Sequence, residues 1–348
     1  MINVAFILDH PLMDYRIPFF EKLAELNLNL TVIHTGDTRA LNGVSEVISK
    51  NIKVGKFFYR TLPDLSAFDV VICMQNIRMI NIWTMSLDPF KKYRLYHWGI
   101  GLSSSKGLIN QNKFMLFFRF FLTIFVKKLF LYSDYPRTTY PLFLRRKLLN
   151  VNNTVYNPNP INTSGLQKGS FLFIGGLNKR KGIEELISAY YHYAINQFNP
   201  LRLVIVGDGN TEYKKQLLEL VKRLELQDYV VFKGKISSLE IKKSLFSNAV
   251  ACLSLKQAGL SVLESFSYGV PFVSYRSAIS GGEHLHIRNG FNGYLVNDEM
   301  EASKVMTKLH NEPCHSSYLG LNSYYYYLEN CTMDNMVEIF FSEIGNTN

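Results

Sequence analysis

Residues 249–275, AVACLSLKQAGLSVLESFSYGVPFVSY, decide the fold class. Two nearly uncharged apolar runs, 249–255 and 271–275, enclose a short apolar segment that opens at Gly259. This is the pattern of two buried parallel strands joined by a helix. The amino end of such a helix lies at the carboxyl edge of the sheet, where phosphate groups bind. Glu264 follows within about one and a half helical turns, so we expect a nucleotide at this edge.

The same alternation of strands and helices runs through the whole chain. In the first half, strand-like runs cover 2–8, 28–36, 69–74, 93–99, 129–135 and 153–158. In the second half, strands and amphipathic helices alternate more regularly. This predicts an α/β protein with two doubly wound, Rossmann-like domains facing each other across a cleft. The Asn-, Pro- and Gly-rich stretch 157–169 is the expected hinge, which gives domains 1–160 and 161–330, and a C-terminal helix within 331–348 is expected to pack back on the first.

The net charge of +10 lies entirely in the first half of the chain. Residues 1–160 hold 20 Lys and Arg against 10 Asp and Glu, whereas residues 161–348 hold 18 of each kind. The asymmetry predicts an anionic partner for the first half. No nucleic-acid-binding motif is recognisable, so we expect an anionic membrane surface and no nucleic acid.

Composition and termini indicate where the protein works. A mean hydropathy near zero argues against a multispanning membrane protein. The amino-terminal sequence has no basic segment ahead of an apolar one, so no signal peptide is expected. Four scattered cysteines form no C-x-x-C pair, which favours reduced thiols and a cytoplasmic protein.

Residues 113–131, KFMLFFRFFLTIFVKKLFL, combine seven phenylalanines with basic residues. The uncharged runs are shorter than the roughly 20 residues that span a bilayer. Aromatic and basic side chains together predict an interfacial helix on anionic lipid, with Lys113, Arg119, Lys127 and Lys128 facing the membrane. The alternative is a core helix whose basic stems lie along apolar surface.

Residues 175–186, GGLNKRKGIEEL, follow a strand and open a helix. Gly175 and Gly176 let the backbone approach a ligand closely. Lys179, Arg180 and Lys181 place positive charge at a helix start, which opposes the macrodipole. A bound diphosphate would relieve that conflict; a solvated loop is the alternative.

Other motifs narrow the class of reaction. The stretch YHWGIG places His97 at a strand end before two glycines, where it is expected either to contact a substrate or to be structural. His284 and His286 have no third ligand at metal spacing, and no Asp-x-Asp pair occurs. We therefore expect neither a metal nor another cofactor. The motifs G-x-G-x-x-G after the first strand, G-x-S-x-G and G-x-x-x-x-G-K-[ST] are all absent.

The second half resembles the nucleotide-binding half of family-4 glycosyltransferases of the GT-B fold, such as those of bacterial cell-envelope polysaccharides. The matching segments, in order, are FIGGLNKRKGIEELISAY, LVIVGDGN, VVFKGKI, LSVLESFSYGVPFVS and GGEHLHIRNGFNGYLV. The resemblance implies transfer of a sugar from a nucleotide sugar, with a UDP-sugar favoured, with retention and without metal. It makes 161–330 the nucleotide-sugar-binding domain and 1–160 the acceptor-binding domain.

The resemblance also implies a role for each matching residue. Lys181 would hold the donor diphosphate, Glu264 the ribose hydroxyls, and His97 would lie near the transferred sugar. The remaining expected donor contacts are phosphate-binding Gly259, Leu260 and Ser261, and Lys235 and Ile236 beside the base.

The sequence departs from the family at two positions. Lys256 replaces the first glutamate of the E-x7-E motif, and Gly176 replaces an arginine that Lys179 or Arg180 could supply. Lys256 is expected at the other end of the pocket that holds Glu264, in contact with the diphosphate or the sugar. Two alternatives stay open: a GT-B-fold sugar-nucleotide epimerase, and a non-catalytic sugar-nucleotide-binding partner of another transferase. The favoured hypothesis is a glycosyltransferase attached to the inner face of the cytoplasmic membrane. Its acceptor would be a lipid-linked glycan in polysaccharide, O-antigen or capsule assembly.

Overall fold

The computed structural model describes residues 1–103 and 111–345, and the chain divides into two compact units. Unit 1 comprises Met1–Tyr156 and Cys331–Asn348, and unit 2 comprises Asn157–Asn330. The first boundary lies four residues before the one expected from the sequence. Of the C-terminal segment 331–348, the last three residues lie outside the described part.

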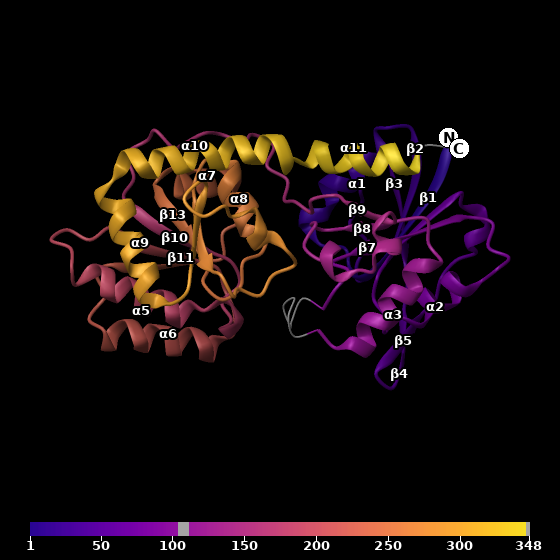
Figure 1. The fold of residues 1–348 in the computed structure, drawn as a ribbon, viewed down its shortest axis with the longest axis horizontal. Helices are drawn as coiled ribbons and strands as arrows, with labels where there is room; N and C mark the ends of the chain where they lie inside the picture. The colour runs from indigo at the N-terminus through magenta and orange to yellow at the C-terminus, as the bar shows by residue number, and fades with distance from the viewer. Residues whose placement is uncertain (104–110, 346–348) are drawn as a thin grey trace. The chain divides into compact units, whose positions relative to one another are not determined.

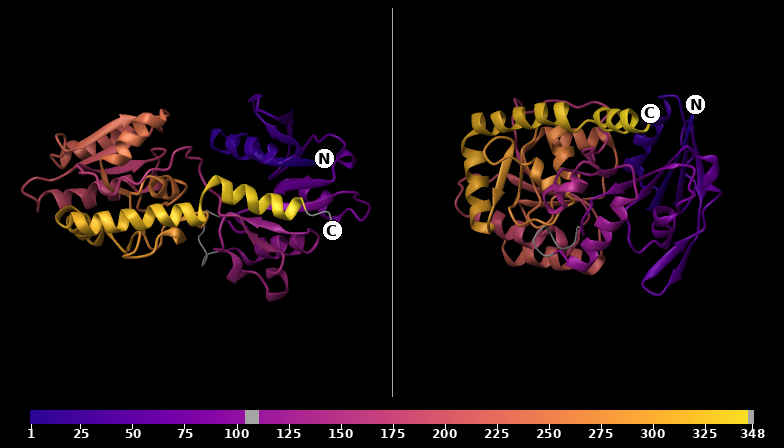
Figure 2. Two further views of the ribbon diagram at one scale, coloured as in Figure 1. Left: turned by 90° about the horizontal axis from the view of Figure 1, so that it is seen from above. Right: turned by 45° about the vertical axis from the view of Figure 1, so that its right-hand side comes forward.

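Unit 1 is built on a seven-stranded parallel sheet with the order β3-β2-β1-β6-β7-β8-β9 (Figure 1). Its strands are β1 (Ile2–Pro11), β2 (Leu28–Thr35), β3 (Val44–Ile48), β6 (Val70–Met74), β7 (Arg94–Gly99), β8 (Leu129–Leu131) and β9 (Leu148–Asn150). Its α-helices are α1 (Ile17–Ala24), α2 (Ile80–Leu87), α3 (Lys113–Ile124), α4 (Leu142–Arg145) and α11 (Met333–Ile344). A separate antiparallel ribbon, β4 (Asn51–Val54) with β5 (Phe57–Arg60), projects from this unit (Figures 1 and 2).

Both faces of the unit 1 sheet are covered, which explains why its central strands are apolar throughout. Side chains of α1 and α11 share a core with one face, and side chains of α2 and α3 share a core with the other. Phe340 of α11 packs 4.3 Å from Phe130 and 5.3 Å from Trp98, measured between ring centroids. The last helix of the chain is therefore part of the unit 1 core.

Unit 2 is built on a six-stranded parallel sheet with the order β12-β11-β10-β13-β14-β15. Its strands are β10 (Ser170–Ile174), β11 (Arg202–Val206), β12 (Val230–Gly234), β13 (Ala249–Leu253), β14 (Phe272–Tyr275) and β15 (Gly293–Val296). Its α-helices are α5 (Ile183–Ala194), α6 (Thr211–Arg223), α7 (Leu239–Ser247), α8 (Ser261–Ser267), α9 (Glu299–Asn311) and α10 (Pro313–Asn330). Short 3-10 turns occur at Asp14–Arg16, Leu65–Ala67, Arg137–Thr139, Lys179–Lys181 and Glu283–His286.

The strand order of unit 2 reverses between β10 and β13. Both strands are completely buried. Helix α6, by contrast, buries only one side. Asn210 caps α6 by accepting from the amides of Glu212 and Tyr213. In a doubly wound sheet, the crevice at the carboxyl end of the reversal point binds ligands.

The α/β, doubly wound fold class predicted from the sequence is confirmed, and one expected strand is wrong. Residues 153–158 are not a strand; β9 lies before them, at Leu148–Asn150. Asn152 has a φ of 47°, which extended strands do not adopt, and Pro158 has no amide for a sheet hydrogen bond.

Candidate functional site

A pocket of about 560 Å³ lies in unit 2, at the carboxyl ends of β10, β11 and β12 and at the start of α8. We call it the carboxyl-edge pocket. It is lined by Ile174, Gly175, Gly176, Lys181, Val206, Gly207, Asp208, Lys235, Ile236, Lys242, Leu260, Ser261 and Glu264. Most of the residues expected to bind a nucleotide sugar are thus brought together around one hollow.

Glycines let the loops after β10 and β11 run in close contact beneath this pocket. A Cβ added at Gly207, whose φ is 145°, would lie 1.8 Å from the carbonyl oxygen of Gly175. The Gly175 amide donates to the Val206 carbonyl at 3.0 Å, and the Gly207 amide donates to the Gly234 carbonyl at 2.8 Å. The turn 206–210 needs glycine at position 207 because two backbones meet there.

Lys181 supplies a positive charge to the pocket. Among the described residues, its Nζ makes one hydrogen bond, to the carbonyl oxygen of Gln257 at 3.5 Å. Burial lowers the pKa of this ammonium, and the carboxylate of Glu283 opposes the shift. An ammonium can donate three hydrogen bonds, so Lys181 keeps unused donors toward the hollow.

The start of α8 places a second unused polar group in the pocket. The side chain of Ser261 lines the pocket, and its hydroxyl is buried without a partner in the described part of the chain. Gly259 does not line the pocket, but a Cβ at this position would lie 3.7 Å from Lys181 Nζ. The Gly259–Ser261 turn and the Lys181 ammonium therefore lie next to each other.

Glu264 faces the same pocket from α8 and is not unpaired. Lys242 of α7 donates to its Oε1 at 2.7 Å. Which basic residue pairs with Glu264 could not be assigned from the sequence, because Lys242 lies on a different helix, 22 positions away. The pairing satisfies part of the carboxylate's need for donors without removing it from the pocket.

Besides Gly259, three predicted contacts lie outside the pocket lining. Lys179 and Arg180 are exposed residues of the 3-10 turn that precedes α5. Lys256 is also exposed and forms an ion pair with Glu185 on α5. We expected Lys256 at the far end of the same pocket, and the structure instead directs its ammonium to α5.

Glu283 was not predicted from the sequence, although it follows a glycine pair beyond β14. Its carboxylate accepts from the backbone amides of Gly281 and of Glu283 itself, and burial raises its pKa. The Oε2 atom is buried and has no partner among the described residues. Only 9% of the residue is exposed, and Lys181 is the charged group that interacts with it.

The prediction that His97 faces a substrate is corrected by its burial. Its side chain is completely buried inside unit 1, and Ser86 Oγ lies 3.3 Å from its Nε2. Burial lowers the pKa of His97 to about 3, so the imidazole is neutral. The contact with Ser86 of α2 and the lack of exposed surface place the His97 side chain between the sheet and α2.

The prediction for residues 113–131 is correct only in part. The helix ends at Ile124, and residues 129–131 form the buried strand β8. Arg119 does not face outward: its Nη1 donates to the carbonyl oxygen of Gln75 at 3.1 Å and to its Oε1 at 3.3 Å. Lys128 donates to the Arg146 carbonyl at 3.0 Å. Lys113 and Lys127 are exposed.

The outer side of α3 is nevertheless apolar and exposed. Phe114 and Phe117 are 62% and 60% exposed. We call this surface the α3 aromatic face; its exposed apolar side chains are Phe114, Met115, Phe117, Ile124 and Phe125. Contiguous exposed apolar surface is typical of an interaction site.

A second pocket, of about 710 Å³, opens beside this face in unit 1. We call it the aromatic pocket. Trp83 and Phe118 pack there with ring centroids 5.2 Å apart, and Phe118 and Phe114 with centroids 4.5 Å apart. It is lined by Lys56, Phe57, Ile77, Arg78, Trp83, Ser103, Gln111, Asn112, Phe114, Met115 and Phe118.

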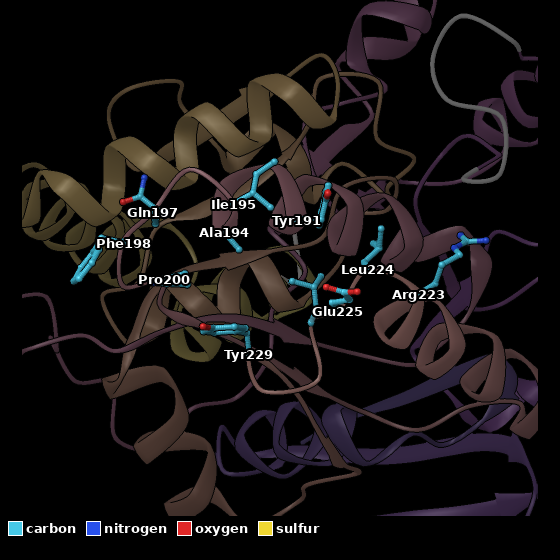
Figure 3. Close-up of a pocket in the computed structure, with 11 residues that line it drawn as sticks. Tyr191, Ala194, Ile195, Gln197, Phe198, Pro200, Arg223, Leu224, Glu225 and Tyr229 are labelled. Atoms are coloured by element: carbon cyan, nitrogen blue, oxygen red, sulfur yellow. The ribbon is translucent and has the colours of Figure 1, made fainter.

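A third hollow, of about 530 Å³, lies at the amino edge of the unit 2 sheet, where α5 leads to β11 and α6 leads to β12 (Figure 3). Figure 3 shows Tyr191, Arg223 and Tyr229 at its border. It holds no Lys, Ser or Gly cluster like that of the carboxyl-edge pocket. It also lies at the opposite edge of the sheet from the carboxyl-edge pocket.

Within residues 1–103 and 111–345, no three His, Cys, Asp or Glu side chains are grouped so that they could hold a metal ion. No helix of that same part of the chain is long and apolar enough to cross a bilayer.

Residues 160–324 match the family model described as glycosyl transferases group 1. Unit 2 is therefore a domain of this glycosyltransferase family. Two curated relatives are similar over part of this region. The chain is 28% identical over 117 residues to alpha-monoglucosyldiacylglycerol synthase of Streptococcus pneumoniae, and 31% identical over 125 residues to N-acetyl-alpha-D-glucosaminyl L-malate synthase of Bacillus anthracis. These stretches cover 32% and 36% of this chain, and 25% and 31% of the relatives' lengths.

The fold of the whole chain is that of GT-B glycosyltransferases. The crystal structure of Anabaena HepE in complex with UDP matches with a TM-score of 0.74 over 99% of both chains, at 13% sequence identity. The predicted GT-B fold is thereby confirmed for both units.

Proposed function

We propose that the protein is a glycosyltransferase that takes its sugar from a nucleotide sugar, with a UDP-sugar as donor. The observation that carries the proposal is the pair of unused polar groups in the carboxyl-edge pocket, Lys181 Nζ and Ser261 Oγ. An ammonium and a hydroxyl beside a glycine-lined sheet edge suit a diphosphate. The family match of unit 2 and the UDP bound by HepE agree with it.

The same groups have a role in the reaction. When the bond between sugar and phosphate breaks, negative charge develops on the diphosphate leaving group. Fixed donors aimed at such charge lower the barrier, and one donor is worth roughly 3–4 kcal/mol. Lys181 and the Gly259–Ser261 turn would supply them without a metal ion. We propose retention at the anomeric carbon, on the family resemblance.

On the acceptor side we propose a lipid-linked glycan. The aromatic pocket of unit 1 is large enough for an apolar chain, and Lys56 and Arg78 at its lining suit an anionic head group. The α3 aromatic face beside it would rest on the membrane surface, with Lys113 and Lys127 toward anionic lipid. One curated relative is named as a synthase of a glycolipid, which agrees with such an acceptor. We therefore propose that the protein works at the cytoplasmic face of the membrane, in polysaccharide, O-antigen or capsule assembly.

A donor screen tests the proposal. The protein is incubated with a panel of UDP-, GDP- and dTDP-sugars together with a membrane lipid extract, and the products are read by mass spectrometry. We expect release of free UDP from one sugar, with a glycosylated lipid. Conversion of the donor to an epimer would instead support the epimerase, and binding without turnover would support the non-catalytic partner. Failure to bind any nucleotide sugar would overturn the proposal.

A further inference from the structure

The residues that line the carboxyl-edge pocket indicate which way round a nucleotide would lie in it. Lys235 and Ile236 lie at its β12 end, Glu264 stands on α8, and Lys181 lies beside Gly259. A nucleoside diphosphate placed with its ribose at Glu264 and its phosphates at Lys181 therefore has its base toward β12. A sugar attached to the outer phosphate would extend beyond Lys181, away from Lys235.

Glu283 lies in the loop between β14 and β15, and these strands lie on the opposite side of β10 from β12 and Lys235 in the sheet order. Burial raises the pKa of the Glu283 carboxyl, and the positive charge of Lys181 opposes that shift. The Lys181 ammonium donates to the Gln257 carbonyl at 3.5 Å, and Glu283 Oε2 has no hydrogen-bond partner in the described part of the chain. The loop that carries Glu283 is tied to the loop before α8, because the Ile279 amide donates to the Lys256 carbonyl at 2.8 Å.

The two oxygens of Glu283 differ in what they do. The backbone amides of Gly281 and Glu283 bind the carboxylate and hold the glycine loop, while Oε2 stays buried with no partner in the described residues. Leaving a charged oxygen buried and unpaired costs free energy. A purely structural carboxylate would need only the backbone bonds, so the free oxygen calls for a donor from outside the chain.

The geometry points to Glu283 as the side chain that accepts hydrogen bonds from hydroxyl groups of the transferred sugar. This inference rests on the proposed nucleotide-sugar donor and names the residue that selects its sugar. Neighbouring hydroxyls of a hexose are paired donors, and a carboxylate binds them by charge-assisted hydrogen bonds. A site that must satisfy a buried carboxylate also discriminates against sugars that lack the matching hydroxyl.

The substitution Glu283→Gln tests the inference. The amide oxygen of glutamine can still accept from the two backbone amides, so the loop is retained while the charge is removed. Affinities for UDP, and for UDP-glucose, UDP-galactose and UDP-N-acetylglucosamine, are measured by calorimetry. We expect UDP affinity within about twofold of the wild type and at least about tenfold weaker binding of the preferred UDP-sugar, as for the loss of one charge-assisted bond.

The matched control is Glu46→Gln in unit 1. Glu46 is another buried carboxylate, but its bonds go to His34 Nε2 and to backbone amides such as that of Arg39. This control should leave the ratio of UDP-sugar to UDP affinity unchanged. If Glu283→Gln does not fold, Glu283→Asp, which keeps the charge but withdraws it from the sugar, should give the same selective loss; retained UDP binding shows that unit 2 is folded.

Each outcome of these binding measurements supports or overturns the assignment of Glu283 to the sugar. Selective loss of the sugar's contribution supports the inference. Equal binding of the UDP-sugar by wild type and variant overturns it, and so does a parallel loss of UDP and UDP-sugar, which would assign Glu283 to the diphosphate or the loop. If the wild type binds UDP but Glu283→Gln changes nothing, the proposed donor survives and the inference fails. If the wild type binds no nucleotide, both fail.

Discussion

Lys242 Nζ lies 2.7 Å from Glu264 Oε1, so the carboxylate assigned to the ribose already has a cationic partner. Both side chains line the carboxyl-edge pocket and are mostly buried. A ribose can share the carboxylate with Lys242, because each carboxylate oxygen accepts two hydrogen bonds. The pair positions the carboxylate for a ligand and keeps it satisfied when the ligand is absent.

We expect Glu264→Gln to weaken UDP and UDP-sugar binding to the same extent, by about tenfold, since the ribose is common to both. Calorimetry on the variant measures this, with Glu240→Gln on the exposed side of α7 as the control. Unaltered UDP binding by Glu264→Gln would refute the assignment of the ribose to this residue.

The cationic partner can be tested by itself. Lys242→Met should lower the free energy of unfolding of the ligand-free protein by about 1 kcal/mol, because a partly buried ion pair is broken. Lys243→Met, at the exposed neighbouring position, should change stability less. Equal effects of the two variants in differential scanning calorimetry would show that the pair contributes nothing.

Lys256 is expected to act on stability more than on sugar choice. Its ammonium is paired with Glu185, whose Oε2 is buried without a partner in the described part of the chain. Lys256→Glu would bring two carboxylates together, and we expect a loss of about 1–3 kcal/mol in the free energy of unfolding. Urea denaturation measures the loss.

A charge swap provides the control for Lys256. The double variant Lys256→Glu/Glu185→Lys restores an opposite pair and should recover most of the lost stability. A Lys256→Glu variant of normal stability that accepts a different nucleotide sugar would instead return Lys256 to the donor site.

His97 should make unit 1 less stable in acid. The folded protein protonates it only near pH 3, whereas the unfolded chain does so near 6.5, so the unfolded state binds more protons between these values. Stability should therefore fall as pH drops through this window, by up to about 1.4 kcal/mol per pH unit. His286, whose pKa burial lowers to about 4, adds to the effect in unit 2.

The measurement compares urea unfolding at about pH 7 and about pH 5 for the wild type and His97→Gln. The variant should lose less stability on acidification. His97→Ala should reduce stability while leaving turnover per folded molecule unchanged, because the side chain is enclosed in the core. A variant with full stability and lost turnover would contradict the structural role.

The α3 aromatic face should bind membranes. Phe114→Ser/Phe117→Ser is expected to abolish flotation with vesicles containing anionic phospholipid, because apolar area and nearby lysines act together there. Phe198→Ser is the matched control: Phe198 is fully exposed and belongs to unit 2. Flotation that the double substitution leaves unchanged would remove the membrane from the proposal.

The arrangement of the carboxyl-edge pocket could be predicted largely from the sequence. Gly175, Lys181 and Glu264 each follow a run of apolar residues that can only be a buried strand or its crossover helix. Parallel strands bring their carboxyl ends to one edge, so local patterns were enough to place these residues together. Lys242 and Glu283 could not be assigned, because their roles depend on partners that sequence spacing does not reveal.

The predictions that His97 faces a substrate and that Arg119 faces the membrane were wrong for the same reason. His97 and Trp98 are neighbours on one strand, and alternation sends their side chains to opposite faces of the sheet. Nothing in YHWGIG tells which face is occupied by α2. Arg119 likewise sits among phenylalanines that face outward, and only the packing of α3 on the sheet turns its guanidinium to Gln75.

The sequence by itself determined the α/β class, the two-unit organisation and the edge of the unit 2 sheet at which a nucleotide is expected. These depend on periodicity, on glycine positions and on the order of strands and helices along the chain, which can be read from the sequence. Only the tertiary structure decided which charged groups are paired: Lys242 with Glu264, Lys256 with Glu185, and Glu283 with one oxygen free. Pairing depends on distances across helices and loops far apart in the sequence, and burial then sets what each unpaired charge costs.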